Sequence, residues 1–596
     1  LPYISLSQEK FTLNGYITDK ESGESLIGAT VYINELNAGT VTNAYGFYSI
    51  TLDEGTYSLD FRYIGYVSMS RSIDLNSNQK VDIELEGDDI QLENIVISDQ
   101  AEDFNVSSIE MSTAKLDMSK ISEIPTFLGE NDIIKAIQLL PGVSSVGEGA
   151  SGFNVRGGSV GQNLVLLDEA PVYNSSHLLG FLSVFNPDAV KDLKLYKGGI
   201  PSRFGGRLSS ILDIRMKDGN NKKTVVSGGI GSIFSRFTLE SPIKKDKSSF
   251  ILALRRSYAD ILFSPFLKNS GVFNDGSALN FYDITAKANF DLDPKNTIFV
   301  SSYIGRDVFM FDERQGFNWG NRTGTLRWNH LFNDRLFSNF TLIYSNYDYQ
   351  LAFGSDDMNK FEWDSKVETY NFKPELTYFI NANNELSLGA EVIRYRFEPA
   401  NAVGVSEGEI SDITLPSKYA FEGSFYIGNE QKFSNLTLSY GARYSLYSYY
   451  GPSFKYEFGA PLFLGDRKPL ISESEIIGND RIQSYSSFEP RVSINLKISN
   501  TASVKASYNK MTQYIHLLSN TAASSSLDVW TPSTNNIKPE IGHSYVFGLF
   551  KNFRNNTFES SIEVYYKDLE NQIDYIDGAD LLINKYFEGD LLSGIG

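Results

Sequence analysis

Two glycine-rich stretches are the first places in this sequence where residue types could carry chemistry. Gly147–Gly152 spells G-x-G-x-x-G, and Gly157–Gly161 spells G-x-S-x-G. The first pattern binds a dinucleotide when it follows a strand and opens a helix, and the second exposes a nucleophilic serine on a strand-turn-helix. Here the first stretch follows a loop and precedes a strand, and no strand-turn-helix frames the second. We therefore interpret these glycines as tight turns.

Histidine and cysteine usage argues against a metal or thiol enzyme. The four histidines are His177, His330, His516 and His543; none begins an H-x-x-E or H-E-x-x-H pattern, and the chain has no cysteine. A zinc peptidase needs clustered His and carboxylate ligands, and a disulfide framework needs cysteines. The sequence predicts no enzyme activity, no metal site and no cofactor.

Three arginines, Arg156, Arg203 and Arg207, lie in one segment, Asn131–Lys217, which reads as a small globular unit. A β-rich stretch follows it to the end of the chain, so we expect this unit to fill the lumen of a barrel. A guanidinium binds a carboxylate through two parallel hydrogen bonds. We expect these arginines to pair with carboxylates of the barrel wall. The alternative is a latch that releases when the unit moves.

Local patterns predict the elements that position these arginines. Asn131–Leu140 has apolar residues at helical spacing, Asn131 or Asp132 as its cap, and Pro141-Gly142 as its end. Phe153–Arg156 and Asn163–Leu167 are typical of short strands. Asn186–Lys191 predicts a capped helical turn before a further strand.

This segment resembles the plug domain of TonB-dependent receptors. "NVRGG" (Asn154–Gly158) is similar to the family's I-R-G motif, and "VLLDEAPV" (Val165–Val172) to its hairpin, with Glu169 where glycine is usual. "VKDLKLYKGGIPSRFGGRLSSILDIRMK" is similar to the closing stretch, with Phe204 in place of Tyr. The resemblance makes the following residues candidates for plug motif and gating roles: Arg156, Gly157, Asp168, Arg203, Gly205 and Arg207.

The N-terminal segment, Phe11–Glu86, consists of short β-prone runs separated by turns, a spacing typical of a small β-sandwich. Gly46 is expected to adopt a positive φ in its turn. The segment resembles the carboxypeptidase-regulatory-like domain, a transthyretin-like sandwich. No histidine lies in it, so catalysis is not expected there.

A short β-prone run follows in a polar stretch, and it is a candidate for pairing with a partner's strand. By its position it resembles a TonB box. The alternatives are a last sandwich strand or a linker. The candidate box consists of Leu92, Glu93, Asn94, Ile95, Val96, Ile97 and Ser98.

From about Lys223 onward, apolar and polar residues alternate. Arg491–Ile498 is the clearest case, with Val, Ile, Leu and Ile on one face and Arg, Ser, Asn and Lys on the other. Polar residues inside and apolar residues outside are typical of a membrane barrel, as is the aromatic share of 13%. Long polar segments near Ala400–Pro416, Tyr449–Gln483 and Leu517–Lys538 alternate with short turns. We count roughly 15 strands where plugged transporters have about 22, so we expect a barrel whose C-terminal strands are missing here.

The predicted fold is all-β with a small α/β plug: a transmembrane antiparallel β-barrel occluded by the plug and preceded by a β-sandwich. The predicted divisions are residues 1–8 as the remainder of a signal peptide, 9–88 as the sandwich, 89–118 as the linker with the candidate box, 119–220 as the plug, and 221–596 as the barrel, C-terminally incomplete.

The resemblance implies TonB-dependent active import across a bacterial outer membrane, with the N-terminal domain in the periplasm. The implied partners are TonB with its inner-membrane energising complex, the lipid bilayer and an imported substrate of unknown identity. A surface-exposed lipoprotein partner stays open, because the Ala-rich plug ending of SusC-like transporters is absent. The alternative function is a structural scaffold barrel in an outer-membrane complex. The net charge of −20 argues against a nucleic-acid partner.

Overall fold

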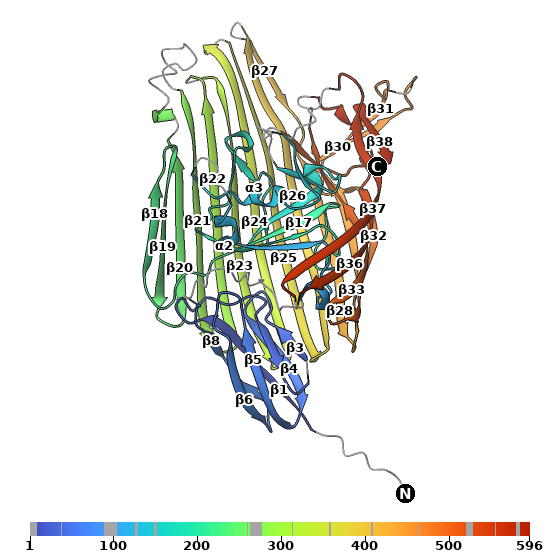
Figure 1. Cartoon of the computed structure of the whole chain (residues 1–596). Coiled ribbons are helices and arrows are strands. Elements are labelled where there is room, and N and C mark those ends of the chain that lie inside the picture. Colours follow the sequence, from blue (N-terminus) through green and yellow to red (C-terminus); the bar gives the residue numbers. More distant parts are fainter. Residues whose placement is uncertain are drawn as a thin grey trace.

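The chain builds a small β-sandwich, a plug and a curved wall of long strands that surrounds the plug (Figure 1). In Figure 1 the sandwich, in blue, lies below the wall, and the elements of the plug lie inside it. The computed structural model describes residues 9–36, 38–88, 104–124, 129–147, 152–258, 260–262, 277–312, 314–356, 359–406, 409–463, 465–519, 528–554, 556–579 and 584–595. The candidate box, Leu92–Ser98, lies outside them.

The sandwich has two sheets, with the strand orders β4-β1-β7 (β8 also pairs with β1) and β3-β2-β5-β6. Alternating residues such as Leu13, Val31, Ile50 and Phe61 fill the space between the sheets. Gly46 has φ 75° in the turn before β4, as the sequence predicts. The strands are β1 (Lys10–Asp19), β2 (Thr30–Ile33), β3 (Ala38–Val41), β4 (Phe47–Asp53), β5 (Gly55–Arg62), β6 (Met69–Leu75), β7 (Gln79–Lys80) and β8 (Ile83–Leu85).

The plug is built on a sheet of order β13-β12-β17-β16-β9, in which β12 and β17 are parallel. Its strands and helices are α1 (Phe104–Ser107), β9 (Thr113–Asp117), α2 (Met118–Ser122), α3 (Ile133–Gln138), β10 (Val143–Ser145), β11 (Phe153–Val155), η1 (Val160–Gln162), β12 (Asn163–Leu167), β13 (Ala170–Pro171), β14 (Ser176–His177), η2 (Leu178–Gly180), β15 (Leu182–Ser183), β16 (Val190–Tyr196) and β17 (Ser210–Met216).

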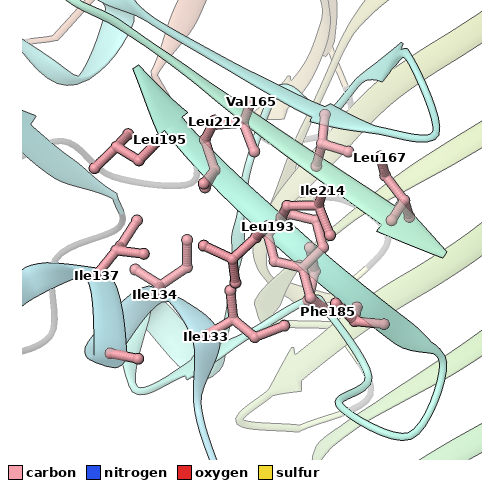
Figure 2. Close-up of a cluster of buried hydrophobic side chains, with 14 of the residues drawn as sticks. Ile133, Ile134, Ile137, Val165, Leu167, Phe185, Leu193, Leu195, Leu212 and Ile214 are labelled. Atoms are coloured by element: carbon pink, nitrogen blue, oxygen red, sulfur yellow. The ribbon is translucent and has the colours of Figure 1, made fainter. Parts of the chain in front are cut away.

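Helix α3 covers one face of this sheet. Its three isoleucines, Ile133, Ile134 and Ile137, point toward Leu193 and Leu212 of the central strands (Figure 2). The helix begins as the sequence predicts, because the Asp132 carboxylate accepts a hydrogen bond of 2.8 Å from the Lys135 N–H. The capped turn expected at Asn186–Lys191 is present: the Asn186 carbonyl accepts a hydrogen bond of 3.0 Å from the Ala189 N–H, and the Asn186 side chain accepts one of 3.0 Å from the Asp188 N–H. The turn is shorter than expected, because β16 already begins at Val190.

Among the described residues, the wall is a 17-stranded antiparallel sheet whose strands follow one another in chain order, and two further hairpins outside this sheet are inserted between its later strands. Its strands are β18 (Val225–Ile230), β19 (Phe234–Lys244), β20 (Ser248–Ser257), β21 (Ala278–Asp293), β22 (Asn296–Met310), β23 (Gly316–Asn333), β24 (Leu336–Asp356), β25 (Asn359–Asn381), β26 (Asn384–Ser406), β27 (Glu409–Thr414), β28 (Lys418–Lys432), β29 (Leu436–Tyr450), β32 (Arg481–Ser499), β33 (Ala502–Gln513), β36 (Glu540–Phe553), β37 (Phe558–Tyr575) and β38 (Leu591–Ile595).

In the wall, apolar side chains are exposed and polar side chains are buried, which is the reverse of a soluble protein. On β32, Val492, Ile494 and Leu496 are 38%, 38% and 42% exposed, whereas Arg491 and Asn495 are 6% and 1% exposed. Apolar side chains outside and polar side chains inside are what a wall in lipid requires. In the described part of the chain, no helix has the length and apolarity to cross a membrane.

All three long polar segments contain strands. Residues 400–416 include the end of β26 and strand β27, which pairs with it, and 449–483 contain the hairpin of β30 (Ser453–Phe458) and β31 (Leu470–Ile476). The third forms the hairpin of β34 (Ile515–Leu518) and β35 (Val529–Pro532), whose residues are mostly buried. β35 contacts β26 and β28, and β34 contacts η1 of the plug. This hairpin therefore folds inward over the plug.

Candidate functional site: the plug against the barrel wall

The turn between β12 and β13 places two acidic residues, Asp168 and Glu169, against the wall. Leu167 pairs with Ala170, so these two residues form a two-residue hairpin loop, and their φ values are 46° and 74°. Positive φ at both positions is the type I′ geometry, which favours Asn-Gly or Asp-Gly. A glutamate at the second position is strained, and its side-chain contacts must offset that strain.

Glu169 is the centre of a buried ionic cluster. Its Oε1 lies 3.2 Å from Arg327 Nη2 on β23 and 3.4 Å from Arg215 Nη1 on β17, and its Oε2 lies 4.0 Å from Lys373 Nζ on β25. Burial alone would raise the pKa of Glu169, but Arg327, Lys373 and Arg215 outweigh it and hold that pKa well below its ordinary value. Glu169 is therefore a fixed negative charge joining the plug to the wall.

Asp168 binds a second cation of the wall. Its Oδ2 lies 3.0 Å from Lys287 Nζ on β21, and its Oδ1 accepts a hydrogen bond of 2.9 Å from the Met216 N–H. Its carbonyl accepts hydrogen bonds from Arg327 at 3.2 Å and from Thr325 at 3.3 Å. The Asp168 carboxylate thus fixes the hairpin both within the plug and to the wall.

His177, on β14, forms another junction. Its Nε2 lies 2.7 Å from Asp283 Oδ1 on β21, its Nδ1 lies 2.5 Å from Asp307 Oδ2 on β22, and its ring stacks on Phe281 with centroids 4.4 Å apart. Both nitrogens can donate only in the imidazolium form. Desolvation lowers the pKa of His177, but Asp283 and Asp307 outweigh it and raise the pKa to about 9.

Arg156 and Gly157 lie at the opposite wall. Arg156 has φ 48° and Gly157 φ 79°, and Arg156 Nη2 lies 3.0 Å from Glu563 Oε2 on β37. The Arg156 guanidinium also stacks over the Tyr565 ring at 4.6 Å. Arg156 therefore has the wall carboxylate partner that the sequence analysis expected of all three arginines.

Arg203 and Gly205 lie where a wall arginine, Arg443, contacts the backbone of the plug. The Arg203 carbonyl accepts a hydrogen bond of 3.4 Å from Arg443 Nη1 on β29, and a Cβ built on Gly205 would lie 2.4 Å from Arg443 Nε. Glycine at 205 therefore lets Arg443 approach the plug backbone while it pairs with Glu391 at 2.6 Å. The Arg203 guanidinium stacks over Phe204 at 4.9 Å and pairs with no carboxylate among the residues that the structure describes.

Arg207 lines a pocket between the plug and the inward hairpin. The pocket has a cavity volume of about 40 Å³ and is partly open to solvent. The Arg207 guanidinium lies 5.0 Å from the Trp530 ring of β35, which Tyr173 of the plug contacts edge-on at 5.3 Å. In the described ranges, no three His, Asp or Glu side chains are arranged to hold a metal ion.

The sandwich docks on both the plug and the wall. Asp334, in the turn between β23 and β24, accepts hydrogen bonds from Asn14 at 3.1 Å and from Asn78 at 3.0 Å, and Phe47 stacks on Phe337. Tyr45 donates a hydrogen bond of 3.1 Å to Glu169. Sequence reasoning missed Tyr45 and His177. The sequence marked Glu169 as unusual only because glycine is usual at that position in the family's hairpin.

Family models match three consecutive parts of the sequence. A "CarboxypepD_reg-like domain" model matches residues 13–97, a "TonB-dependent Receptor Plug Domain" model matches 110–210, and a "TonB dependent receptor-like, beta-barrel" model matches 255–585, which is more than half of the chain. No curated protein matches the sequence significantly.

Solved structures share the fold at low sequence identity. The siderophore receptor PirA from Acinetobacter baumannii is 15% identical with a TM-score of 0.54, over 81% of this chain and 75% of that one. A mutant of the ferric enterobactin receptor PfeA from Pseudomonas aeruginosa, in complex with enterobactin, is 13% identical with a TM-score of 0.53, over 80% of this chain and 75% of that one. The copper transporter OprC is 12% identical with a TM-score of 0.56, over 78% and 74%.

Proposed function

The chain belongs to the TonB-dependent receptor family, and we propose that it imports a substrate across the outer membrane by TonB-driven movement of its plug. Proteins of this family are receptors and transporters rather than enzymes, and their barrels lie in the outer membrane. For this chain we further propose that the sandwich and the candidate box lie in the periplasm, where TonB reaches them.

The observation that carries this proposal is the chemistry of the plug surface. The plug is held to the wall by ion pairs and hydrogen bonds, such as Glu169 with Arg327, His177 with Asp283 and Arg156 with Glu563. Polar contacts can be exchanged for water at modest net cost, whereas an apolar interface would expose its surface on opening. A plug held in this way suits a gate that must move and return.

The proposed box supplies the connection to the energy source. In a pull-down of the full-length protein with the periplasmic domain of TonB, Val96→Pro removes a backbone N–H from the proposed pairing strand. Val96→Ala is the matched control, because it shortens the side chain and keeps the N–H. We expect wild type and Val96→Ala to capture TonB and Val96→Pro to lose most of the binding.

Two results would count against this proposal in different ways. Equal capture by Val96→Pro and wild type would place the TonB contact outside the candidate box. Absence of capture by every variant would favour the alternative, a scaffold barrel in an outer-membrane assembly.

A further inference from the structure

Arg207 differs from the other buried arginines of this protein. Among the described residues, five arginines are exposed to 6% or less: Arg207, Arg255, Arg327, Arg443 and Arg491. Four of them have a carboxylate oxygen close by: Asp283 at 2.5 Å, Glu169 at 3.2 Å, Glu391 at 2.6 Å and Glu489 at 3.0 Å, in that order. Within the described ranges, Arg207 has no carboxylate within 4 Å.

The acidic residues around Arg207 are engaged elsewhere. Among the carboxylates, Glu422 and Glu540 have the largest influence on the pKa of Arg207. Both have other partners: Glu422 accepts a hydrogen bond of 3.2 Å from Tyr395, and Glu540 accepts one of 3.1 Å from Gln162. Arg207 itself donates at 2.7 Å to the carbonyl of Gly206, and its Nε has no partner among the described residues. A buried cation without an anion is costly, and burial lowers the pKa of Arg207.

The guanidinium faces a pocket suited to a ligand. Tyr173 and Asn174 of the plug form one side of the pocket, and Leu517 and Trp530 of the inward hairpin form the other. The Arg207 guanidinium lies over the Trp530 ring, 5.0 Å from its centroid, as a cation–π pair. The pocket thus offers a bidentate donor beside aromatic surface. Asp528, which also lines the pocket, has contacts of its own and is not among the groups with the largest influence on the pKa of Arg207.

The position of the pocket fits the entry side of the barrel. The sandwich docks at Asp334, next to the start of β24, and Glu169 lies near Asn339 of the same strand. The pocket is lined by Tyr347, eight residues further along β24, on the side away from the sandwich. At about 3.3 Å per residue, this is about 26 Å along the strand. A ligand arriving from outside would meet Arg207 before the plug hairpin.

We propose that Arg207 binds an oxyanion of the imported substrate, a carboxylate or a phosphate, while Trp530 and Tyr173 hold the adjoining apolar part. This inference rests on the proposed import function and names the class of its substrate. The planar guanidinium of arginine can donate two parallel hydrogen bonds to either oxyanion. An anion bound here would take the place of the carboxylate that Arg207 lacks among the described residues.

The test uses Trp530 as the reporter in the full-length, detergent-purified protein. Inorganic phosphate and acetate are titrated separately at constant ionic strength in chloride, and tryptophan fluorescence is followed. We expect saturable quenching by at least one of the two anions, and the comparison of the two tells phosphate from carboxylate. Arg207→Gln should weaken that binding at least about tenfold, because a hydrogen bond to a charged group is lost. Arg203→Gln, four residues away and outside the pocket lining, should bind as wild type does.

Two further variants keep the test decisive. Arg207→Lys keeps the charge and loses the fork, so we expect intermediate affinity, and this variant replaces Arg207→Gln if the latter does not fold. Trp530→Phe should abolish the fluorescence change. The proposal is overturned if neither anion gives a saturable response, if the Arg207 variants bind as wild type does, or if the response persists in Trp530→Phe. TonB capture by these variants tests the import function separately.

Discussion

The hydroxyl of Tyr45 donates a hydrogen bond of 3.1 Å to Oε1 of Glu169, which joins the N-terminal sandwich to the tip of the plug hairpin. The same oxygen of Glu169 lies 3.2 Å from Arg327 of the barrel wall. One carboxylate thus contacts all three parts of the protein. A shift of the sandwich that moves Tyr45 would therefore directly affect the ion pair between Glu169 and Arg327.

Removal of the Tyr45 hydroxyl should loosen this three-way contact. A hydrogen bond to a charged group is worth about 1.5–3 kcal/mol, so we expect Tyr45→Phe to increase hydrogen exchange in the plug hairpin. Tyr48→Phe is the matched control, because the Tyr48 hydroxyl donates to the Val81 carbonyl within the sandwich at 2.8 Å. Equal exchange in the hairpin of wild type and Tyr45→Phe would show that the contact carries no coupling.

Replacement of Glu169 by glycine tests whether the ion pairs outweigh the backbone strain. Glycine suits φ 74° and relieves on the order of 1–3 kcal/mol of strain. It also leaves Arg327 without its carboxylate partner, and loss of one partner of a buried pair costs about 3–5 kcal/mol. We therefore expect Glu169→Gly to be less stable than wild type in denaturant titration. A more stable Glu169→Gly would contradict the central role of the cluster.

A methyl group at position 205 should displace Arg443. A Cβ on Gly205 would lie 2.4 Å from Arg443 Nε, so the side chain must leave its position beside Glu391. Overpacking at a tight contact costs about 1–3 kcal/mol, and we expect Gly205→Ala to lower the unfolding midpoint accordingly. Gly324→Ala is the control, since no atom lies within 4 Å of its built Cβ. Equal effects of the two variants would sink this interpretation.

Alkaline pH should weaken the junction at His177. The pKa of this histidine is raised from 6.5 to about 9 in the folded protein, so its stabilising effect is complete below pH 6.5 and is lost as the pH rises through about 9. Each pKa unit corresponds to about 1.4 kcal/mol, which makes the effect on the order of 3 kcal/mol. Heat-unfolding midpoints between pH 6 and pH 10 should fall for wild type and stay nearly flat for His177→Gln.

A control histidine makes this pH test specific. His330 lies on β23 and contacts Asn296, away from the plug. His330→Gln should retain the alkaline fall of the wild type. A fall of the same size in His177→Gln would assign the pH dependence to other groups.

The sequence predicted those features that depend on local patterns. The cap at Asp132, the turn glycine at 46 and the alternation on β32 each follow from a few neighbouring residues, and the structure has all three. The cluster at Glu169 could not be predicted in this way, because Arg327 lies about 160 residues further along the chain. No short-range pattern specifies such a pair.

The inward hairpin was missed for a similar reason. Residues 517–538 have the polar composition of a surface loop, yet Trp530 and Thr531 are buried against the lumen. Burial there depends on partners from β26 and β28 that are distant in the sequence. The expectation that all three plug arginines pair with wall carboxylates held for Arg156 alone, because composition does not show which carboxylates are already engaged.

The place of β9 in the plug has a mechanical consequence. This strand is the first of the plug sheet along the chain and lies at its edge, paired only with β16 from Thr113↔Tyr196 to Asp117↔Asp192. Under the proposed import function, tension passed along the chain to β9 would load a strand that a single row of hydrogen bonds holds in the sheet, and these bonds can break one pair after another. A central strand would resist with two rows at once. Under the proposed import function, a pull from the N-terminal side would therefore act on an edge strand, and the rest of the sheet could remain folded while β9 separates from β16.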